Sequence, residues 1–266
     1  QELNVYVVTD MECASGGVTP EDVQPAGARY AMARAMLTAE VNAAVRGAHA
    51  AGASHIAVLN GHGAASAYNI NYDDIEPPAV HIAGSPWHCY LPGLDASVDI
   101  VFQIGAHARS GTPGALLEHT MSSVNWVSCR LDGDEIGEMQ LIAAFAAHYG
   151  ARMGLVTGDA AACAEAKASF PSVLTVETKR GLSRTAGVLR PWGAVFSEIE
   201  SAAEQAVRSC ERIPVLPRRG PCALEICFSH TPSAGQLDGR PGVERLDGVT
   251  VRICGRDIVE AVGRLY

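Results

Sequence analysis

The chain has 266 residues, of which 48 % are hydrophobic and 18 % charged, a balance typical of globular proteins that excludes intrinsic disorder. With 20 Lys and Arg against 29 Asp and Glu, the formal net charge is −9, which argues against nucleic acid as a partner because phosphate binding needs a basic surface. No run of about 18 apolar residues occurs, so we expect neither a membrane-spanning helix nor a membrane partner.

Eight cysteines are spread along the chain without a C-x-x-C pair. Several lie in apolar, strand-like contexts, such as Cys227 in CALEICF. In a chain long enough to bury its own core, reduced buried cysteines are a simpler interpretation than disulfides. The N-terminal run LNVYVVTD also lacks the basic region and cleavage site of a signal peptide. Together these features predict a cytoplasmic protein.

Strand-like and helical segments alternate over most of the chain. In order, the patterns predict a strand over 3–9, an Ala-rich helix within 21–51, strands over 55–60 and 99–106, a helix over 137–149, a strand over 153–158, and helices over 159–168 and 192–211. This spacing is typical of βαβ units around a parallel sheet. We therefore predict an α/β fold with a mostly parallel sheet flanked by helices, in a Rossmann-like three-layer arrangement.

The composition changes after these helices. Residues 213–222 are rich in Pro and Arg and are interpreted as a connector. The remaining patterns predict strands over 222–228 and 249–254, a Gly/Pro/Ser-rich loop over 229–242 and a short terminal helix over 257–265. They indicate a smaller C-terminal α+β unit, which a strand over 173–178 would begin. We place the larger α/β domain at residues 1–180 and the smaller domain at 181–266.

Carboxylates and histidines follow three of the predicted strands. Asp10 and Glu12 follow the first strand, His62 the second and His107 the third. The carboxyl ends of parallel strands meet at one edge of a sheet, and residues two apart on an extended chain project to the same side. Carboxylate and imidazole together suit Zn²⁺, and also Mn²⁺ or Co²⁺. Each residue alone is more typical of a turn or a structural histidine, but three at one edge make a metal site an equally good interpretation.

Two further groups fit a site at this edge. A Gly-rich loop over 109–114 precedes His119 and would bend it back over the site, although a histidine of a surface loop is the alternative. Asp134, Glu135 and Glu138 surround the start of a predicted helix, where the helix dipole alone favours acidic residues. Composition therefore does not choose a ligand among these three.

At these residues the sequence resembles the D-aminopeptidases of the M55 family of zinc metallopeptidases. The matching stretches are VTDMECASG (8–16), the segment 37–63 ending in NGHG, IGAHARSGTPGALLEHTM (104–121), the segment 133–166 beginning GDEIGE, and GLSRTAGVL (181–189). They run in order through essentially the whole chain. The elements D-M-E, G-A-H-A-R and I-G-E are specific in combination, although none is specific alone.

The resemblance implies a hydrolase with a binuclear zinc site, two Zn²⁺ per subunit. Carried over residue by residue, the metal ligands would be Asp10, Glu12, His62, His107 and Glu138. Asp10 would bridge the metals, and Glu138 is chosen over Glu135 because it is the Glu of I-G-E. His119 matches the family's catalytic histidine, and its role as base, nucleophile or oxyanion stabiliser stays open.

The resemblance also implies an aminopeptidase that acts on short peptides with N-terminal D-amino acids. The family's known member is a ring-forming decamer, so a ring-like homo-oligomer is expected. The sequence departs from the family at Cys13, which replaces a Gly, in the turn 60–63, and in a longer loop over 114–119. These departures leave open an amidohydrolase acting on a small N-acyl or amide metabolite. A non-enzymatic binding module with a structural or vestigial metal site is a third hypothesis, against which the intact set of expected site residues argues.

Two other residues near the expected site have two interpretations each. Arg109 would bind a substrate carboxylate or form a structural ion pair. Asp159, at the end of the strand 153–158, would orient a ligand histidine or cap the following helix.

Overall fold

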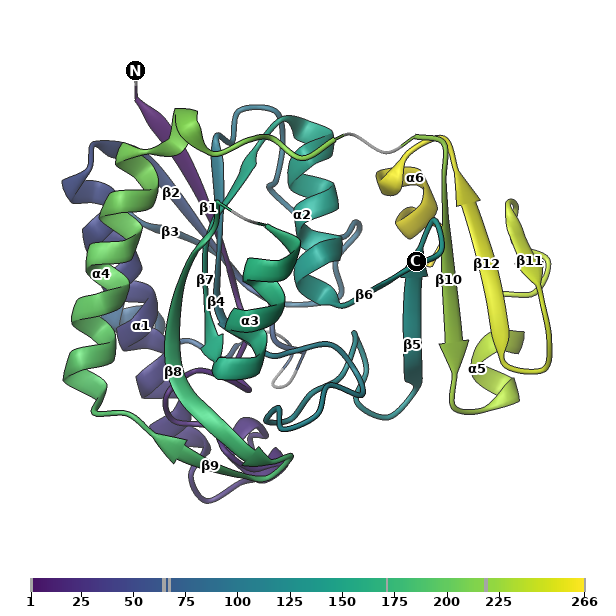
Figure 1. The fold of residues 1–266 in the computed structure, drawn as a ribbon, viewed down its shortest axis with the longest axis horizontal. Helices are drawn as coiled ribbons and strands as arrows, with labels where there is room; N and C mark the ends of the chain where they lie inside the picture. Colours follow the sequence, from purple (N-terminus) through teal and green to yellow (C-terminus); the bar gives the residue numbers. More distant parts are fainter. Residues whose placement is uncertain (1, 64–65, 67, 171, 218–219, 266) are drawn as a thin grey trace.

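The computed structural model describes residues 2–63, 66, 68–170, 172–217 and 220–265, which form two sheets and their flanking helices (Figure 1). The first sheet has seven strands in the order β3-β2-β1-β4-β7-β8-β9. Its strands are β1 (Leu3–Thr9), β2 (Ala53–Asn60), β3 (Val80–Ile82), β4 (Ile100–Ala106), β7 (Arg152–Asp159), β8 (Leu174–Ser183) and β9 (Ala186–Leu189). All pairs are parallel except β8 with β9, so the predicted mostly parallel α/β sheet is confirmed.

Helices cover both faces of this sheet (Figure 1). On one face lie α1 (Tyr30–Ala50) and α4 (Trp192–Arg208), and on the other α2 (Glu138–Tyr149) and α3 (Ala160–Ser169). The helices α1 and α4 approach closely at Gly47, where a Cβ atom would collide with the backbone carbonyl of Glu200. The buried strands are rich in Val, Ile and Leu, as expected where both faces of a parallel sheet are covered.

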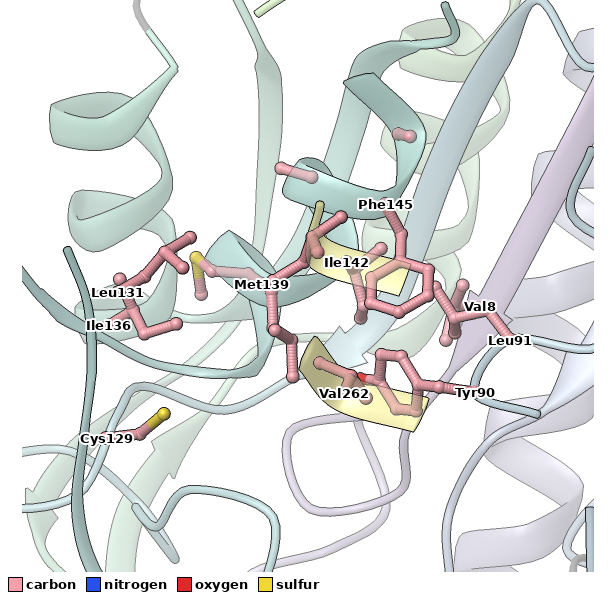
Figure 2. Close-up of a cluster of buried hydrophobic side chains, with 14 of the residues drawn as sticks. Val8, Tyr90, Leu91, Cys129, Leu131, Ile136, Met139, Ile142, Phe145 and Val262 are labelled. Carbon is pink, nitrogen blue, oxygen red and sulfur yellow. The ribbon is translucent and has the colours of Figure 1, made fainter. Parts of the chain in front are cut away.

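A second, antiparallel sheet has the order β11-β12-β10-β5-β6. It consists of β5 (Trp126–Leu131), β6 (Asp134–Ile136), β10 (Cys222–Phe228), β11 (Val243–Arg245) and β12 (Thr250–Gly255). The short helices α5 (Thr231–Gly235) and α6 (Ile258–Gly263) accompany it. Figure 2 shows apolar side chains of α2, such as Met139 and Ile142, packed between Val8 of the first sheet and Leu131 of the second. One continuous core therefore joins both sheets.

The two sheets do not separate at residue 180. Strands β5 and β6 precede that position yet pair in the second sheet, whereas β9 and α4 follow it and belong to the first. The strand expected over 173–178 to begin the smaller unit is β8, and it pairs with β7 in the large sheet instead. The chain crosses between the sheets because β5 of the hairpin β5–β6 pairs with β10, far along the chain.

Several local predictions need adjustment. The first long helix starts at Tyr30, because a 3-10 helix over Pro20–Val23 and a turn occupy the preceding residues. The predicted loop over 229–242 contains α5, and residues 218–219 of the predicted connector lie outside the described residues. All eight cysteines are free thiols. Within the described part of the chain, no helix has the length and apolarity needed to cross a membrane.

Candidate metal centre

The ends of three neighbouring parallel strands carry the expected ligands. Strand β1 lies between β2 and β4, with Thr9 paired to Asn60 on one side and Ile104 on the other. Asp10 directly follows β1, His62 follows β2 by two residues, and His107 directly follows β4. The parallel register thus brings all three side chains to one edge of the sheet, as the strand pattern predicted.

The backbone after β1 turns sharply, which brings Glu12 back to the same edge. Gly105 has a φ of +81°, and a Cβ there would collide with the carbonyl of Asp10. Only glycine allows this close approach at this backbone conformation. The ammonium of Lys179, 1 % exposed, donates hydrogen bonds to the carbonyls of Glu12, Ala14 and Gly17. It therefore holds the turn from inside the protein.

The carboxylate of Asp10 connects two groups of possible ligand atoms. Its Oδ1 lies 3.0 Å from Nδ1 of His62, and its Oδ2 lies 3.2 Å from Nε2 of His107. Glu12 Oε2 lies 3.1 Å from the same His62 nitrogen, and Glu138 Oε1 lies 3.2 Å from the same His107 nitrogen. Glu138 reaches the site because it is the first residue of α2. The sequence-predicted ligands thus lie together around one shared carboxylate.

Each histidine is oriented by a backbone carbonyl. His62 Nε2 lies 3.0 Å from the carbonyl oxygen of Val23, His107 Nδ1 lies 2.9 Å from that of Ala108, and His119 Nδ1 lies 2.8 Å from that of Leu117. A ring nitrogen that donates to a carbonyl carries the proton of the neutral imidazole, so the other nitrogen has a free lone pair. In all three rings that lone pair points toward the carboxylates, which is the arrangement of a metal-binding histidine.

The electrostatics of the site favour a bound cation. Burial alone would raise the pKa of the Asp10 carboxyl, but the neighbouring His107 and His62 rings hold that pKa far below its usual range. Burial alone would lower the pKa of each ring, but Glu12 and Asp10 beside His62, and Glu138 and Asp10 beside His107, raise both ring pKa values well above normal. Buried carboxylates are costly without compensating positive charge, and here protons on the histidines or bound metal ions supply that charge.

Two buried atoms in the cluster have no hydrogen-bond partner among the described residues. They are Glu12 Oε2 and His107 Nε2, although each lies within 3.2 Å of a charged group of the cluster. Buried polar atoms without partners are costly unless an ion or ligand satisfies them. Carboxylate oxygens and imidazole nitrogens are the donors that zinc prefers, so the residues present fit this metal.

His119 lies directly over this cluster. Its ring stacks on that of His107, with ring centres 3.8 Å apart and an interplanar angle of 16°. Its Nε2 lies 3.7 Å from Glu138 Oε1 and 3.9 Å from Glu12 Oε1. The loop before it bends back as expected, since the backbone N–H of Leu116 donates to the Asp159 carboxylate. The position suits either a metal ligand or a group that acts on bound substrate.

Other residues near the expected site take structural positions. Asp159 caps α3 by accepting from the backbone N–H of Ala162, at 2.8 Å. Arg109 lies 3.9 Å from Glu135 in a partly exposed ion pair and does not line the cavity at the site. Cys13 is buried, and its Sγ contacts the carbonyl of Leu116 at 3.6 Å, outside the two candidate metal groups of the described residues.

A cavity of about 560 Å³ opens onto the cluster. Asp10, Glu12, His62, His119 and Glu138 line one part of it. The remaining wall combines apolar residues, among them Val8, Leu59, Trp87, Tyr90, Leu91 and Ile142, with the polar residues Thr9, Gln24, Ser85, Gln103, Ser122 and Ser123. Its size and its mixture of apolar walls with a few polar groups are typical of small-ligand sites.

Sequence reasoning missed three buried polar residues near the site, namely Gln103, Lys179 and Glu40. Gln103 lies in the middle of β4 and lines the cavity, and Lys179 supports the turn after β1. Glu40 is fully buried on α1 and accepts from the backbone N–H of Ser15 at 2.6 Å. One signal was present for Gln103, because it interrupts the otherwise apolar run DIVFQIGA.

Comparison with known proteins identifies the family of this chain. The model of the M55 peptidase family, described as D-aminopeptidase, matches residues 3–265. A D-aminopeptidase of Bacillus subtilis (strain 168) is 28 % identical over 265 residues, covering 97 % of this chain and 94 % of the relative. The solved structure of the Zn-dependent D-aminopeptidase DppA from Bacillus subtilis, described as a self-compartmentalizing protease, superposes with a TM-score of 0.92 at 25 % identity, covering 99 % of this chain and 95 % of that one. With its fold and nearly its whole length matched, the chain belongs to the M55 family of peptidases.

Proposed function

We propose that this protein is a zinc-dependent aminopeptidase with two Zn²⁺ per subunit, acting on short peptides that begin with a D-amino acid. The observation that carries the proposal is the Asp10 carboxylate, whose two oxygens face two separate groups of donors. Asp10, Glu12 and His62 form one group, and His107, His119 and Glu138 form the other. We assign Asp10 as the bridging ligand, and Glu12, His62, His107 and Glu138 as the remaining ligands. Mn²⁺ or Co²⁺ would suit the same donors.

When bound, zinc would act as a Lewis acid that polarises the scissile carbonyl and lowers the pKa of water. The protein's own contribution to proton movement is His119. Its Nδ1 is engaged by the Leu117 carbonyl, so Nε2 faces the cavity with a lone pair and can take a proton from water and return it to the leaving amine. Roles as nucleophile or oxyanion stabiliser are the alternatives, and a metal-ligand role is a third.

The substrate assignment rests on the family, on the curated D-aminopeptidase of Bacillus subtilis and on the solved structure of DppA from the same organism. The cavity supports it, because a recess of about 560 Å³ beside the cluster accommodates a small substrate. We further propose a homo-oligomer, specifically a ring-like decamer, since the solved relative is described as self-compartmentalizing. The mass of the purified protein in solution tests this.

Zinc content and substrate screening test the proposed activity. We expect two zinc ions per chain and loss of activity on chelation, with restoration by Zn²⁺. The screen compares D-Ala-D-Ala-type peptides, their L-counterparts and simple amides or N-acyl compounds. Turnover of the amides alone would assign the protein to the amidohydrolase alternative. Less than one metal per chain, with activity indifferent to chelation, would refute both enzymatic functions.

The His119→Ala variant tests the role of that residue. We expect the variant to keep its zinc and to lose turnover by about 10²–10⁴-fold, the usual contribution of general acid–base catalysis. His230→Ala is the matched control, because His230 is exposed and lies outside the candidate groups. Loss of zinc in His119→Ala would show that His119 is a ligand and would contradict the assigned role.

A further inference from the structure

Gln103 is a buried amide in a place where the fold favours an apolar residue. It lies in the middle of β4, a central strand of the first sheet, and is 2 % exposed. Its neighbours Phe102 and Ile104 point to the opposite face, into the core under α1 and α4. Its Oε1 has no hydrogen-bond partner in the described part of the chain. An unpaired buried amide oxygen is costly, so its presence calls for a partner from outside the fold.

The side chain of Gln103 faces the cavity at the metal centre. It lines that cavity together with the apolar residues Val8, Leu59, Tyr90 and Ile142, and Val8 is its direct neighbour on β1. Figure 2 shows Val8, Tyr90 and Ile142 gathered on one side of the core beside α2. The indole of Trp87 at the same cavity already donates to the carbonyl of Gly84, at 2.7 Å. Gln103 therefore offers a hydrogen bond beside the apolar part of the cavity wall.

The distance between Gln103 and the cluster determines which substrate side chains can contact the Gln103 amide. Val8 pairs with Gln103 across β1 and β4, and Asp10 follows Val8 by two residues. At a rise of about 3.3 Å per residue, Gln103 lies about 7 Å below the level of the cluster. A peptide with its first carbonyl at the cluster would direct its first side chain over this distance. A substrate side chain of three or four heavy atoms and the extended side chain of Gln103 together span this distance of about 7 Å.

We propose that this recess is the pocket for the side chain of the substrate's first residue, and that Gln103 is its specificity-determining residue. The pocket selects a short side chain that ends in a neutral hydrogen-bonding group, a hydroxyl or a carboxamide. An amide both donates and accepts, so it pairs with either group. The apolar residues beside Gln103 disfavour a charged side chain, which would lose part of its hydration there. This proposal rests on the proposed aminopeptidase function.

Matched pairs of peptides test the pocket. The substrates are dipeptides beginning with D-Asn or D-Leu, and with D-Thr or D-Val, because each pair differs little in shape but differs in the polar group. For the zinc-loaded wild type we expect a higher kcat/KM for the polar member of at least one pair. In Gln103→Met the ratio of polar to apolar kcat/KM should fall about tenfold or more, because the polar side chain of the substrate loses its hydrogen-bond partner.

Two controls keep the test decisive. Zinc content and thermal unfolding show whether Gln103→Met is folded, and Gln103→Leu replaces it if it is not, with the same expectation. Ile142→Val alters the apolar part of the cavity wall, and it should change kcat/KM by the same factor for both peptides of a pair. A wild type that favours the apolar member of both pairs, or a ratio that falls less than tenfold in the folded variant, refutes the pocket assignment alone. No hydrolysis of any free-amine peptide by the wild type refutes the proposed function, and this inference with it.

Discussion

Glu40 makes the stability of this protein depend on pH in an unusual direction. It is 0 % exposed on α1, and burial raises the pKa of its carboxyl from 4.5 to about 7. The folded state therefore binds a proton that the unfolded state releases between these values. The stabilisation from this proton is complete below pH 4.5 and is lost as pH rises through 7. Most carboxylates in folded proteins behave in the opposite way.

The substitution Glu40→Gln isolates this effect. The glutamine keeps an oxygen for the N–H of Ser15, which Glu40 now accepts at 2.6 Å, and it resembles the protonated acid without titrating. Since one pKa unit corresponds to about 1.36 kcal/mol, the wild type should lose about 2.5 kcal/mol between pH 5 and pH 8 through Glu40. The free energy of unfolding of the variant, relative to wild type, should rise by that amount over the same interval.

Urea unfolding of both proteins at pH 5 and pH 8 measures the difference. Both proteins are kept in a chelator, because zinc binding has its own pH dependence. Comparing the change in one protein with the change in the other cancels the contribution of all other titrating groups. If the difference in stability between variant and wild type stays constant within about 0.5 kcal/mol from pH 5 to pH 8, the reasoning from burial is wrong.

Two further substitutions test the supports of the site. Lys179→Met removes the ammonium that holds the carbonyls of the turn bearing Glu12, so zinc affinity should fall roughly 10–100-fold in a competition titration with a chelating dye. An unchanged zinc affinity would show that the turn after β1 keeps its conformation without the ammonium of Lys179. Asp159→Ala removes the cap of α3 and the acceptor for the N–H of Leu116, so urea unfolding should show a loss of about 3 kcal/mol. A loss below about 1 kcal/mol would mean that other groups replace the carboxylate.

The ligands at the edge of the first sheet were predictable because the signal for them is local: a strand-like segment and the polar residues that come soon after it. Strands β1 and β4 are short and largely apolar and are followed at once by Asp10 and His107, His62 comes two residues after β2, and parallel pairing brings these ends together. Asp10 and His107 therefore needed no long-range information. Glu138 was different, since the helix dipole explains an acidic residue there equally well, and only the family resemblance separated it from Glu135.

The hairpin β5–β6 was missed although its turn carried a signal. Asp132 and Gly133 have φ values of +53° and +91°, the conformation that Asp-Gly favours in tight hairpins. The flanking strands are short, and only a partner far along the chain stabilises them, so their local pattern was weak. Lys179 was missed for a related reason, because TVETKRG looks like a surface strand until the carbonyls after β1 surround the ammonium.

The pairing of the β5–β6 hairpin with β10 has a consequence for how the protein is made. Leu131 pairs with Leu224, so the hairpin leaves the ribosome long before its partner does. A two-stranded hairpin is marginally stable by itself, and pairings between distant segments form late. Glu138 begins the helix directly after this hairpin, so the pairing of the hairpin with β10 also fixes the chain just ahead of this ligand. We therefore expect a nascent chain that stops short of β10 to carry the strand ends of the site without the pairing that fixes the hairpin before α2.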